Sequence, residues 1–397
     1  LEDAVRIRMR CDVPFGAFLS GGVDSTIVAG LMRQFSGTKI RTFSIGFAQK
    51  EYDETPFARR TAERFGTDHT EFFVEPKVRE ILPDLVRQYD EPFADSSAIP
   101  TWALCQTTRR EVTVALGGDG GDELFCGYDR YKAVKLALML DKLPQALRKV
   151  MAGPIRELIP NSVRQRSPLR RARRFLETVG MDALEQYLQW IAIFNRSRLS
   201  GLLSRDYWSA CLASGDWSGA SDPSEKELDV VDFLRGAFDK FAQRDLTTAI
   251  SFTDMLTYLP GDVMTKVDVA SMSWALETRA PLLDPNVVEL ALQIPLSYKL
   301  KGTVGKRILR EACRDMLPDE IDARPKTGFG VPLDSWFRNE LNAPLKEILF
   351  DPSTRRLPYF DRNFVERLVR EHEERQFDHA ARLWSLLVFR LWEDQQE

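Results

Sequence analysis

Residues 20–25 read Ser-Gly-Gly-Val-Asp-Ser and stand between an apolar run at 14–19 and a helical pattern at 25–35. The run predicts a strand, and two glycines let the following turn approach a ligand closely. Amide N–H groups at a helix N-terminus, with the hydroxyls of Ser20 and Ser25, form an anion site. Asp24 suits such a site only where a divalent cation bridges it to phosphate oxygens. The turn therefore predicts nucleotide binding; an ordinary capped strand-to-helix turn is the alternative.

The N-terminal third alternates strand and helix patterns. Further apolar runs at 40–47, 70–74 and 112–116 alternate with helical patterns at 54–65, 78–89 and 99–109. This order predicts an α/β fold with a parallel, doubly wound sheet, whose ligands bind at the carboxyl ends of the strands. After residue 131 no strand is predicted. We therefore expect an α/β core at 1–131 and a mainly helical region at 132–397 that completes the substrate pocket.

Composition narrows the class of protein. The 397 residues hold 55 Lys and Arg against 59 Asp and Glu, a net charge of −4 that gives no general attraction to nucleic acid or membrane. The five cysteines are scattered without a CxxC pair, which disfavours disulfide and zinc frameworks. No apolar stretch approaches the ~18 residues of a membrane span. We expect a cytoplasmic protein, and we interpret the six arginines of 164–174 as a solvated helix face.

A second glycine-rich loop follows the fourth predicted strand. Residues 117–123 read Gly-Gly-Asp-Gly-Gly-Asp-Glu, with three acidic residues that would repel one another without a cation. The loop predicts metal and substrate binding; a solvated turn is the alternative. The GxxxxGK[ST] and GxGxxG phosphate motifs are absent from the expected places, which disfavours a kinase-like enzyme and a dehydrogenase. The three histidines lie near no motif, which disfavours a histidine-based hydrolase.

Four motifs together resemble one family. Ser20–Ser25 is similar to the pyrophosphate loop (PP-loop) of ATP pyrophosphatases, which have an adenine nucleotide alpha hydrolase-like fold. The loop at 117–123 resembles the SGDGGDE loop of asparagine synthetases. The segment 259–284 and the string 324–330 (Arg-Pro-Lys-Thr-Gly-Phe-Gly) resemble that family's pocket wall and lysine loop. The motifs stand in the family's order and span roughly 1–340, so the chain resembles the synthetase domain of asparagine synthetases.

The resemblance implies amide formation through an acyl-adenylate, with ATP and Mg²⁺. It implies that Lys326 stabilises the charge of the transition state and that Lys306 interacts with pyrophosphate. Asp119, a position that is often Glu in the family, would act as the general base. Asp24 and Asp122 would hold the metal. Three residues would bind the amino-acid substrate: Asp268, Glu277 and Arg279. Nine would bind ATP: Leu19, Ser20, Gly21, Gly22, Asp24, Ser25, Ile45, Gly117 and Gly118.

Some alternatives stay open. The acceptor is free aspartate or another carboxylate, and a ring-closing reaction like that of β-lactam synthetases is a second hypothesis. A third is a catalytically inactive nucleotide-binding subunit, which the retention of Asp24, Asp122 and Lys326 argues against. The expected partners are ATP, aspartate, ammonia, a glutaminase domain N-terminal in the full-length protein, and a second copy in a homodimer. Cys11 is not the nucleophile of such a glutaminase.

Overall fold

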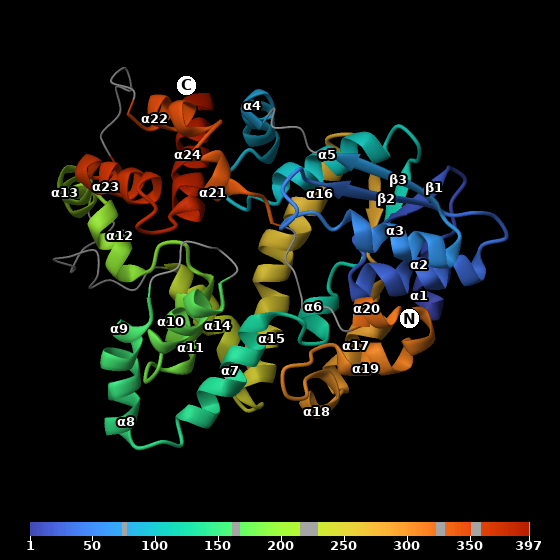
Figure 1. Cartoon of the computed structure of the whole chain (residues 1–397), viewed down its shortest axis with the longest axis horizontal. Coiled ribbons are helices and arrows are strands. Elements are labelled where there is room, and N and C mark those ends of the chain that lie inside the picture. The colour runs from blue at the N-terminus through green and yellow to red at the C-terminus, as the bar shows by residue number, and fades with distance from the viewer. Residues whose placement is uncertain (74–77, 161–166, 215–228, 323–329, 351–358, 397) are drawn as a thin grey trace. The chain divides into compact units, whose positions relative to one another are not determined.

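The four predicted strands form with boundaries close to the expected ones. The computed structural model describes residues 1–73, 78–160, 167–214, 229–322, 330–350 and 359–396. The strands alternate with helices as the apolar runs indicate (Figure 1): β1 (Phe15–Phe18), α2 (Val23–Phe35), β2 (Arg41–Gly46), α3 (Thr55–Phe65), β3 (Asp68–Phe73), α4 (Val78–Tyr89), α5 (Ala98–Thr108) and β4 (Val114–Leu116).

The strands make one parallel sheet in the order β3-β2-β1-β4-β5. Gly16 in the central strand pairs with Arg41 of β2 on one side and with Ala115 of β4 on the other. The chain builds outward from β1 to β3 and then crosses to the opposite side of β1. The carboxyl ends of β1 and β4 therefore flank the point at which the strand order reverses.

The fifth strand corrects the sequence analysis, which predicted no strand after residue 131. β5 (Glu277–Arg279) pairs in parallel with β4, Thr278 beside Ala115. The strand is three residues long and carries two charged side chains, so it lacks the apolar run typical of a buried parallel strand. Its pairing depends on backbone groups, such as the N–H of Gly117, which donates to the carbonyl oxygen of Arg279 at 2.8 Å.

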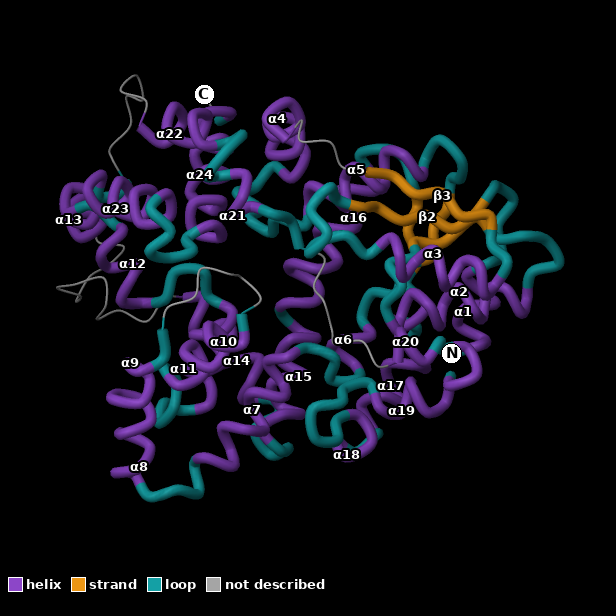
Figure 2. Tube along the Cα trace, in the orientation of Figure 1, coloured by secondary structure: helices purple, strands orange, loops and turns teal. Residues whose placement is uncertain are grey.

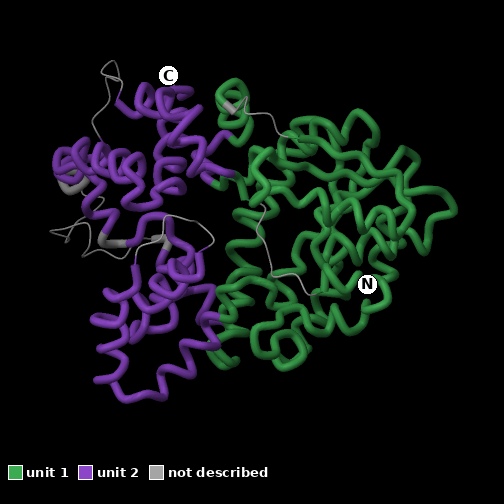
Figure 3. The backbone as a smooth tube through the Cα atoms, in the orientation of Figure 1, with its two compact units in different colours: residues 1–89, 95–132, 241–331 green, residues 90–94, 133–240, 332–397 purple. Residues whose placement is uncertain are grey.

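The chain divides into two compact units (Figure 3). Unit 1 comprises 1–89, 95–132 and 241–331, and unit 2 comprises 90–94, 133–240 and 332–397. The chain thus leaves unit 1 after Lys132 and returns to it at Phe241. The returning segment supplies β5 and the helical elements α15 (Leu246–Leu256), η2 (Leu259–Met264), α16 (Thr265–Met272), η3 (Pro281–Leu283), α17 (Pro285–Gln293), α18 (Leu296–Lys299), α19 (Arg307–Ala312), η4 (Arg314–Met316) and α20 (Asp319–Asp322).

The core of unit 1 joins these distant segments. Ile27 of α2, Leu116 of β4 and Leu282 of η3 are almost fully buried in one cluster with α1 (Glu2–Arg8). Leu309 of α19 belongs to the same cluster. Because the cluster draws on both halves of unit 1, the returning segment completes its hydrophobic core.

Unit 2 is helical in its described parts (Figure 2). Its elements are α8 (Gln145–Val150), η1 (Met151–Ile155), α9 (Arg156–Leu158), α10 (Pro168–Leu176), α11 (Ala183–Ile191), α12 (Arg196–Leu202), α13 (Arg205–Ser214), α14 (Asp229–Asp239), α21 (Leu333–Trp336), α22 (Asn342–Phe350), α23 (Arg362–Glu373) and α24 (Ala380–Gln395). Helix α7 (Asp129–Leu140) starts in unit 1 and continues into unit 2. Among the described residues, no helix is long and apolar enough to cross a membrane.

Candidate functional site

Two glycine-rich turns meet at the carboxyl edge of the sheet in unit 1. Residues 20–25 follow β1, and 117–123 follow β4, its direct neighbour. Leu19 is buried, and its backbone N–H extends the ladder by donating to the carbonyl oxygen of Phe43 at 2.8 Å. Ile45 is buried near the end of β2. Because β2, β1 and β4 are neighbours in the parallel sheet, the ends of these three strands lie side by side.

The first turn is held by its own hydroxyl groups. Ser20 Oγ lies 3.1 Å from Ser25 Oγ and accepts from the N–H of Gly22 at 3.3 Å. Gly21 has a φ of 68°, and a Cβ there would lie 2.5 Å from the carbonyl carbon of Phe57. Only glycine fits this left-handed, closely packed position without strain. The turn then enters the N-terminus of α2, where a helix dipole favours anions.

One lysine joins the two turns. Lys306 Nζ lies 2.7 Å from Asp122 Oδ1 and also contacts Asp24 Oδ2. All three side chains are largely buried, with exposed fractions of 5%, 11% and 13% for Lys306, Asp122 and Asp24. Lys306 has a φ of 56°, and its N–H donates to the carbonyl oxygen of Phe125 at 2.8 Å. This turn before α19 directs the ammonium group between the two carboxylates.

Small residues let the segments approach one another. A Cβ on Gly118 would lie 2.9 Å from Asp24 Cβ, and one on Gly121 would lie 2.5 Å from Asp24 Oδ1. A Cβ on Gly127 would lie 1.9 Å from Asp122 Oδ1 and 2.3 Å from Lys306 Cε. The glycines of the second motif therefore serve close packing around the carboxylates as well as backbone freedom.

The two carboxylates have the chemistry of a magnesium site. Asp24 Oδ1 is buried and has no hydrogen-bond partner among the described residues. The described part of the chain contains no group of three or more His, Cys, Asp and Glu side chains suited to a metal. Magnesium commonly binds through one or two carboxylates together with substrate phosphates, so a two-carboxylate arrangement fits this ion.

Glu123, the third acidic residue of the second loop, was given no role of its own by the sequence analysis. Glu123 is 1% exposed, and burial raises its pKa to about 7 even though the Tyr128 hydroxyl donates to it at 2.6 Å. Arg130 packs over the Tyr128 ring at 4.2 Å and pairs with the fully buried Asp254 at 2.8 Å. These contacts fix α6 (Gly121–Leu124) against the start of α7 and the helix α15.

A second network of charged side chains, which are partly buried, surrounds Lys266 of α16. Its Nζ lies 2.7 Å from Asp95 Oδ2. Burial alone would raise the pKa of Asp95, but the ammonium of Lys266 and hydrogen bonds from Ser97 hold it below its ordinary value. Burial and the charge of Asp95 raise the pKa of Asp262 to about 6. The ammonium of Lys266 is thus balanced by a nearby carboxylate.

The sequence around Asp95 does not indicate that this residue pairs with Lys266. Asp95 precedes Ser97 and accepts from the N–H and the hydroxyl of that residue, both at 2.9 Å. From sequence this pattern is that of an ordinary turn before a helix. Tyr128 and Asp254 likewise lack a local signal, because each interacts with residues that the chain brings together only on folding.

The three residues predicted to bind the substrate differ in their surroundings. Asp268 is exposed on α16. Arg279 Nε donates to Glu277 at 2.6 Å, and its Nη1 donates to the carbonyl oxygens of Arg8 and Arg10 at 2.7 and 3.0 Å. These contacts tie β5 to the end of α1. Substrate binding by Asp268, Glu277 and Arg279 stays a prediction.

The predicted catalytic groups are placed only in part. Asp119 is half-buried in the second loop, and its charge acts on Lys266 and on the Cys105 thiol. The general-base role of Asp119 stays a prediction. Lys326 lies outside the described residues. The other predicted lysine, Lys306, is described and lies at the two loops.

Comparison with known proteins matches the chain to one family. The chain matches the family model described as asparagine synthase over residues 1–394. It is 29% identical over 393 residues to asparagine synthetase (glutamine-hydrolyzing) 1 of Bacillus subtilis, a match that covers 99% of this chain and 58% of that protein. It is 32% identical over 395 residues to a putative asparagine synthetase (glutamine-hydrolyzing) of Mycobacterium bovis, covering 99% and 56%.

A relative with a different printed name is also similar. The chain is 27% identical over 405 residues to amidase chyE of Penicillium rubens, a match that covers 93% of this chain and 57% of that protein. The chain thus spans less than two thirds of the length of each of these relatives.

Proposed function

The chain belongs to the asparagine synthase family, and on this premise we propose that it is a ligase that forms a carbon–nitrogen bond at the expense of ATP. The substrates that we propose are aspartate, ATP and ammonia, and the product is asparagine. The observation that carries the proposal is the contact of Lys306 with both Asp24 and Asp122 at the reversal point of the sheet. It joins the two glycine-rich motifs to the lysine that the resemblance assigns to pyrophosphate.

We propose that the sheet is of the PP-loop type and that the turn at 20–25 binds the phosphates of ATP. The position after β1, the hydroxyls of Ser20 and Ser25 and the N-terminus of α2 support this role. Gly117 and Gly118 would approach the nucleotide from the neighbouring strand end. Ile45 would flank the nucleotide from β2.

We propose that Asp24 and Asp122 hold Mg²⁺. The partnerless, buried Oδ1 of Asp24 and the hard oxygen donors of both side chains fit this ion. When bound, the cation would neutralise charge on the phosphates. Lys306, which already lies between these carboxylates, would contribute a further positive charge to the departing pyrophosphate.

The proposed reaction has two steps. The side-chain carboxylate of aspartate attacks the α-phosphorus, the bond to pyrophosphate breaks, and Lys326 stabilises the charge that develops. Ammonia then attacks the acyl carbon of the adenylate, AMP leaves, and Asp119 accepts a proton. In this scheme Asp268, Glu277 and Arg279 bind aspartate. A glutaminase domain N-terminal in the full-length protein would supply ammonia, and a homodimer is a further proposal.

Carboxylate-dependent exchange of labelled pyrophosphate into ATP tests the first step directly. We expect exchange with aspartate, and we expect Asp122→Asn to abolish it. The matched control is Asp129→Asn, which removes an exposed carboxylate further along the chain and should leave exchange intact. Exchange with another carboxylate but not with aspartate would change the proposed substrate. Absence of exchange with every carboxylate would refute the adenylation step.

A further inference from the structure

Unit 1 has a cavity at the far end of α2 from the candidate site. It is lined by the C-terminal half of α2, by the end of α3, which packs beside α2 (Figure 1), and by the segment that joins α19 to η4. Its volume of about 540 Å³ lies within the range of ~300–1,000 Å³ that is typical of small-molecule pockets. The turn at 20–25 adjoins the opposite, N-terminal end of α2, so the cavity is separate from the proposed nucleotide site.

The inner surface of the cavity is apolar. Phe65, Cys313 and Met316 line it and are half-buried, and the last two pack against the hydrophobic core of unit 1. Gly30 adds no side chain to this surface, and a Cβ there would lie 3.0 Å from Phe65 Cζ and 3.3 Å from Met316 Sδ. The ring and the thioether therefore close over the backbone of α2. They form a floor on which an apolar group is removed from water.

Two arginines form the exposed rim of the same cavity. Arg33 Nε donates to the carbonyl oxygen of Phe65 at 3.2 Å, and Arg64 Nη2 donates to the carbonyl oxygen of Asp315 at 2.7 Å. Because Phe65 directly follows Arg64, the first of these bonds brings both arginines to one stretch of the wall. Each guanidinium group is thus anchored by a backbone carbonyl of the lining itself.

The rim has donors that the protein does not use. Among the described residues, neither Arg33 nor Arg64 is paired with a carboxylate, and Arg33 Nη2 and Arg64 Nε and Nη1 have no hydrogen-bond partner. Asp315 is the one acidic residue in the described lining, which leaves one positive charge in excess. A single excess charge favours a ligand with one anionic group over a polyphosphate.

We propose that this cavity binds an apolar carboxylate, that is, a small molecule with one carboxylate group on an aromatic or aliphatic body. The carboxylate accepts from Arg33 and Arg64, whose planar guanidinium groups match its two oxygens. The apolar body covers Phe65 and Met316. The proposal does not depend on the proposed function, because no residue of this lining belongs to the two glycine-rich loops.

Alkylation of Cys313 by iodoacetamide reports whether the cavity is occupied, because this thiol lines it. The reaction is run on the full chain at mildly alkaline pH, since burial raises the pKa of Cys313, and is followed by peptide mass spectrometry. The probe is phenylbutyrate. Only the free cavity reacts, so a concentration of ten times the dissociation constant should slow alkylation about tenfold. Cys11, a half-buried thiol outside the lining, should be unaffected and is the internal reference.

A neutral analogue tests whether the charge is recognised. Phenylbutyramide has the same apolar body without the carboxylate, so it should need about a tenfold higher concentration for equal protection, a typical loss for one charged hydrogen-bonding group. This comparison uses the wild-type protein and is therefore independent of any folding defect in a variant.

Arg33→Gln and Arg64→Gln should each raise the half-protecting concentration of phenylbutyrate about tenfold. The matched control is Arg60→Gln, which removes an exposed guanidinium of α3 outside the lining and should change this concentration less than about twofold. Absence of protection at Cys313, equal slowing at Cys11 or equal potency of the amide would overturn the proposal. So would wild-type protection in both Arg33→Gln and Arg64→Gln.

Discussion

Lys306 Nζ lies 2.7 Å from Asp122 Oδ1 and also contacts the carboxylate of Asp24, although 282 positions separate Lys306 from Asp24 in the chain. One ammonium group thus holds the first turn of α2 beside α6. Both carboxylates are largely buried, so little water can reach them to take the place of the lysine. The contact is therefore both a structural link and a feature of the proposed metal site.

Lys306→Ala should lower the free energy of unfolding by about 3–5 kcal/mol, because it leaves two buried carboxylates without their cation. Mg²⁺ should restore part of this loss and should stabilise the variant more than it stabilises the wild type. Urea denaturation with and without Mg²⁺ measures both effects. The control is Lys301→Ala, an exposed lysine of the same segment. An equal response of wild type and variant to Mg²⁺ would contradict metal binding by Asp24 and Asp122.

Gly127→Ala should disturb the same contact from the backbone side. The added Cβ would meet Asp122 Oδ1 at 1.9 Å and Lys306 Cε at 2.3 Å, so the ion pair must shift. We expect a loss of stability of about 1–3 kcal/mol and a larger relative loss of aspartate-dependent pyrophosphate exchange. Gly37→Ala is the control, because a Cβ there meets nothing within 4 Å. Unchanged exchange in the folded Gly127→Ala protein would contradict the role of this contact.

Much of the sheet could be predicted from the sequence because short apolar runs alternate with helical patterns along the N-terminal third of the chain. The predicted run at 40–47 became β2 (Arg41–Gly46), and the helical pattern at 78–89 became α4 with the same bounds. β5 could not be predicted, since Glu277 and Arg279 give it no apolar pattern and its place beside β4 depends on the returning segment.

The two loops of the candidate site stand out in the sequence because their chemistry is concentrated in short stretches. The hydroxyls, glycines and carboxylates of 20–25 and 117–123 indicate phosphate and metal binding by composition alone. The pairing of Lys266 with Asp95 was not predictable, because it joins α16 to the loop before α5. Likewise, the arginine run of α10 reads as a solvated face until Asp378 and the end of α11 are placed beside it.

Lys326→Ala should reduce the turnover number far more than it weakens ATP binding. If Lys326 stabilises charge that appears as pyrophosphate leaves, its loss should cost about 2.7–4 kcal/mol, or about 100- to 1000-fold in rate. Steady-state kinetics beside calorimetric titration with ATP separates the two effects. Lys326→Arg should recover activity only in part, because a planar guanidinium does not replace a compact ammonium. Near-normal turnover with weak ATP binding would contradict the assignment.

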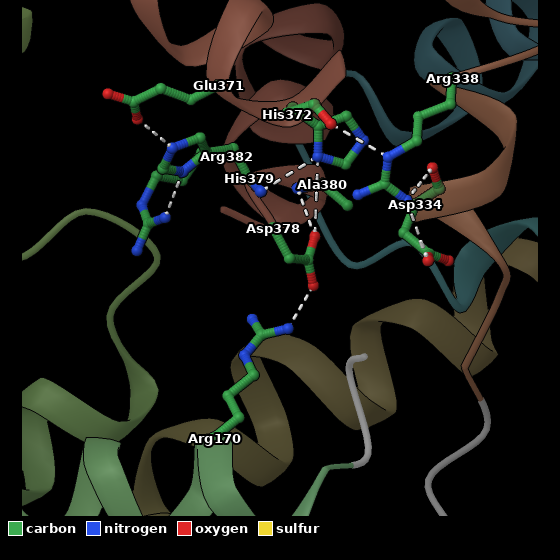
Figure 4. Close-up of polar contacts among 9 residues, drawn as sticks. All are labelled: Arg170, Asp334, Arg338, Glu371, His372, Asp378, His379, Ala380 and Arg382. Atoms are coloured by element: carbon green, nitrogen blue, oxygen red, sulfur yellow. Dashed lines mark hydrogen bonds and ion pairs between the residues drawn. The ribbon is translucent and has the colours of Figure 1, made fainter. Parts of the chain in front are cut away.

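The final prediction concerns His372, which lies fully buried in unit 2 (Figure 4). The backbone N–H of His379 donates to His372 Nδ1 at 3.2 Å, so this nitrogen must accept and the ring must be neutral. Burial and the charge of Arg338, despite the nearby carboxylate of Asp378, lower the pKa of His372 from 6.5 to about 4. A proton on Nδ1 would face the N–H of His379.

The sign of the pH dependence follows from these values. Between pH 6.5 and 4 the unfolded chain binds a proton at His372 that the folded chain does not, so stability is full above pH 6.5 and falls as the pH drops toward 4. The pKa of His379 is also lowered, chiefly by burial, and adds in the same direction. The paired Asp378 has a lowered pKa as well, so its contribution is lost at still lower pH.

Urea midpoints at pH 7 and pH 5 measure this loss in the wild type and in His372→Gln. The glutamine can accept the His379 N–H through its side-chain oxygen but does not titrate, so the variant should lose less stability than the wild type over this interval. The comparison uses the change between the two pH values, so a constant packing defect in the variant cancels. If both proteins lose the same amount of stability, the neutral state of His372 is not a source of acid sensitivity.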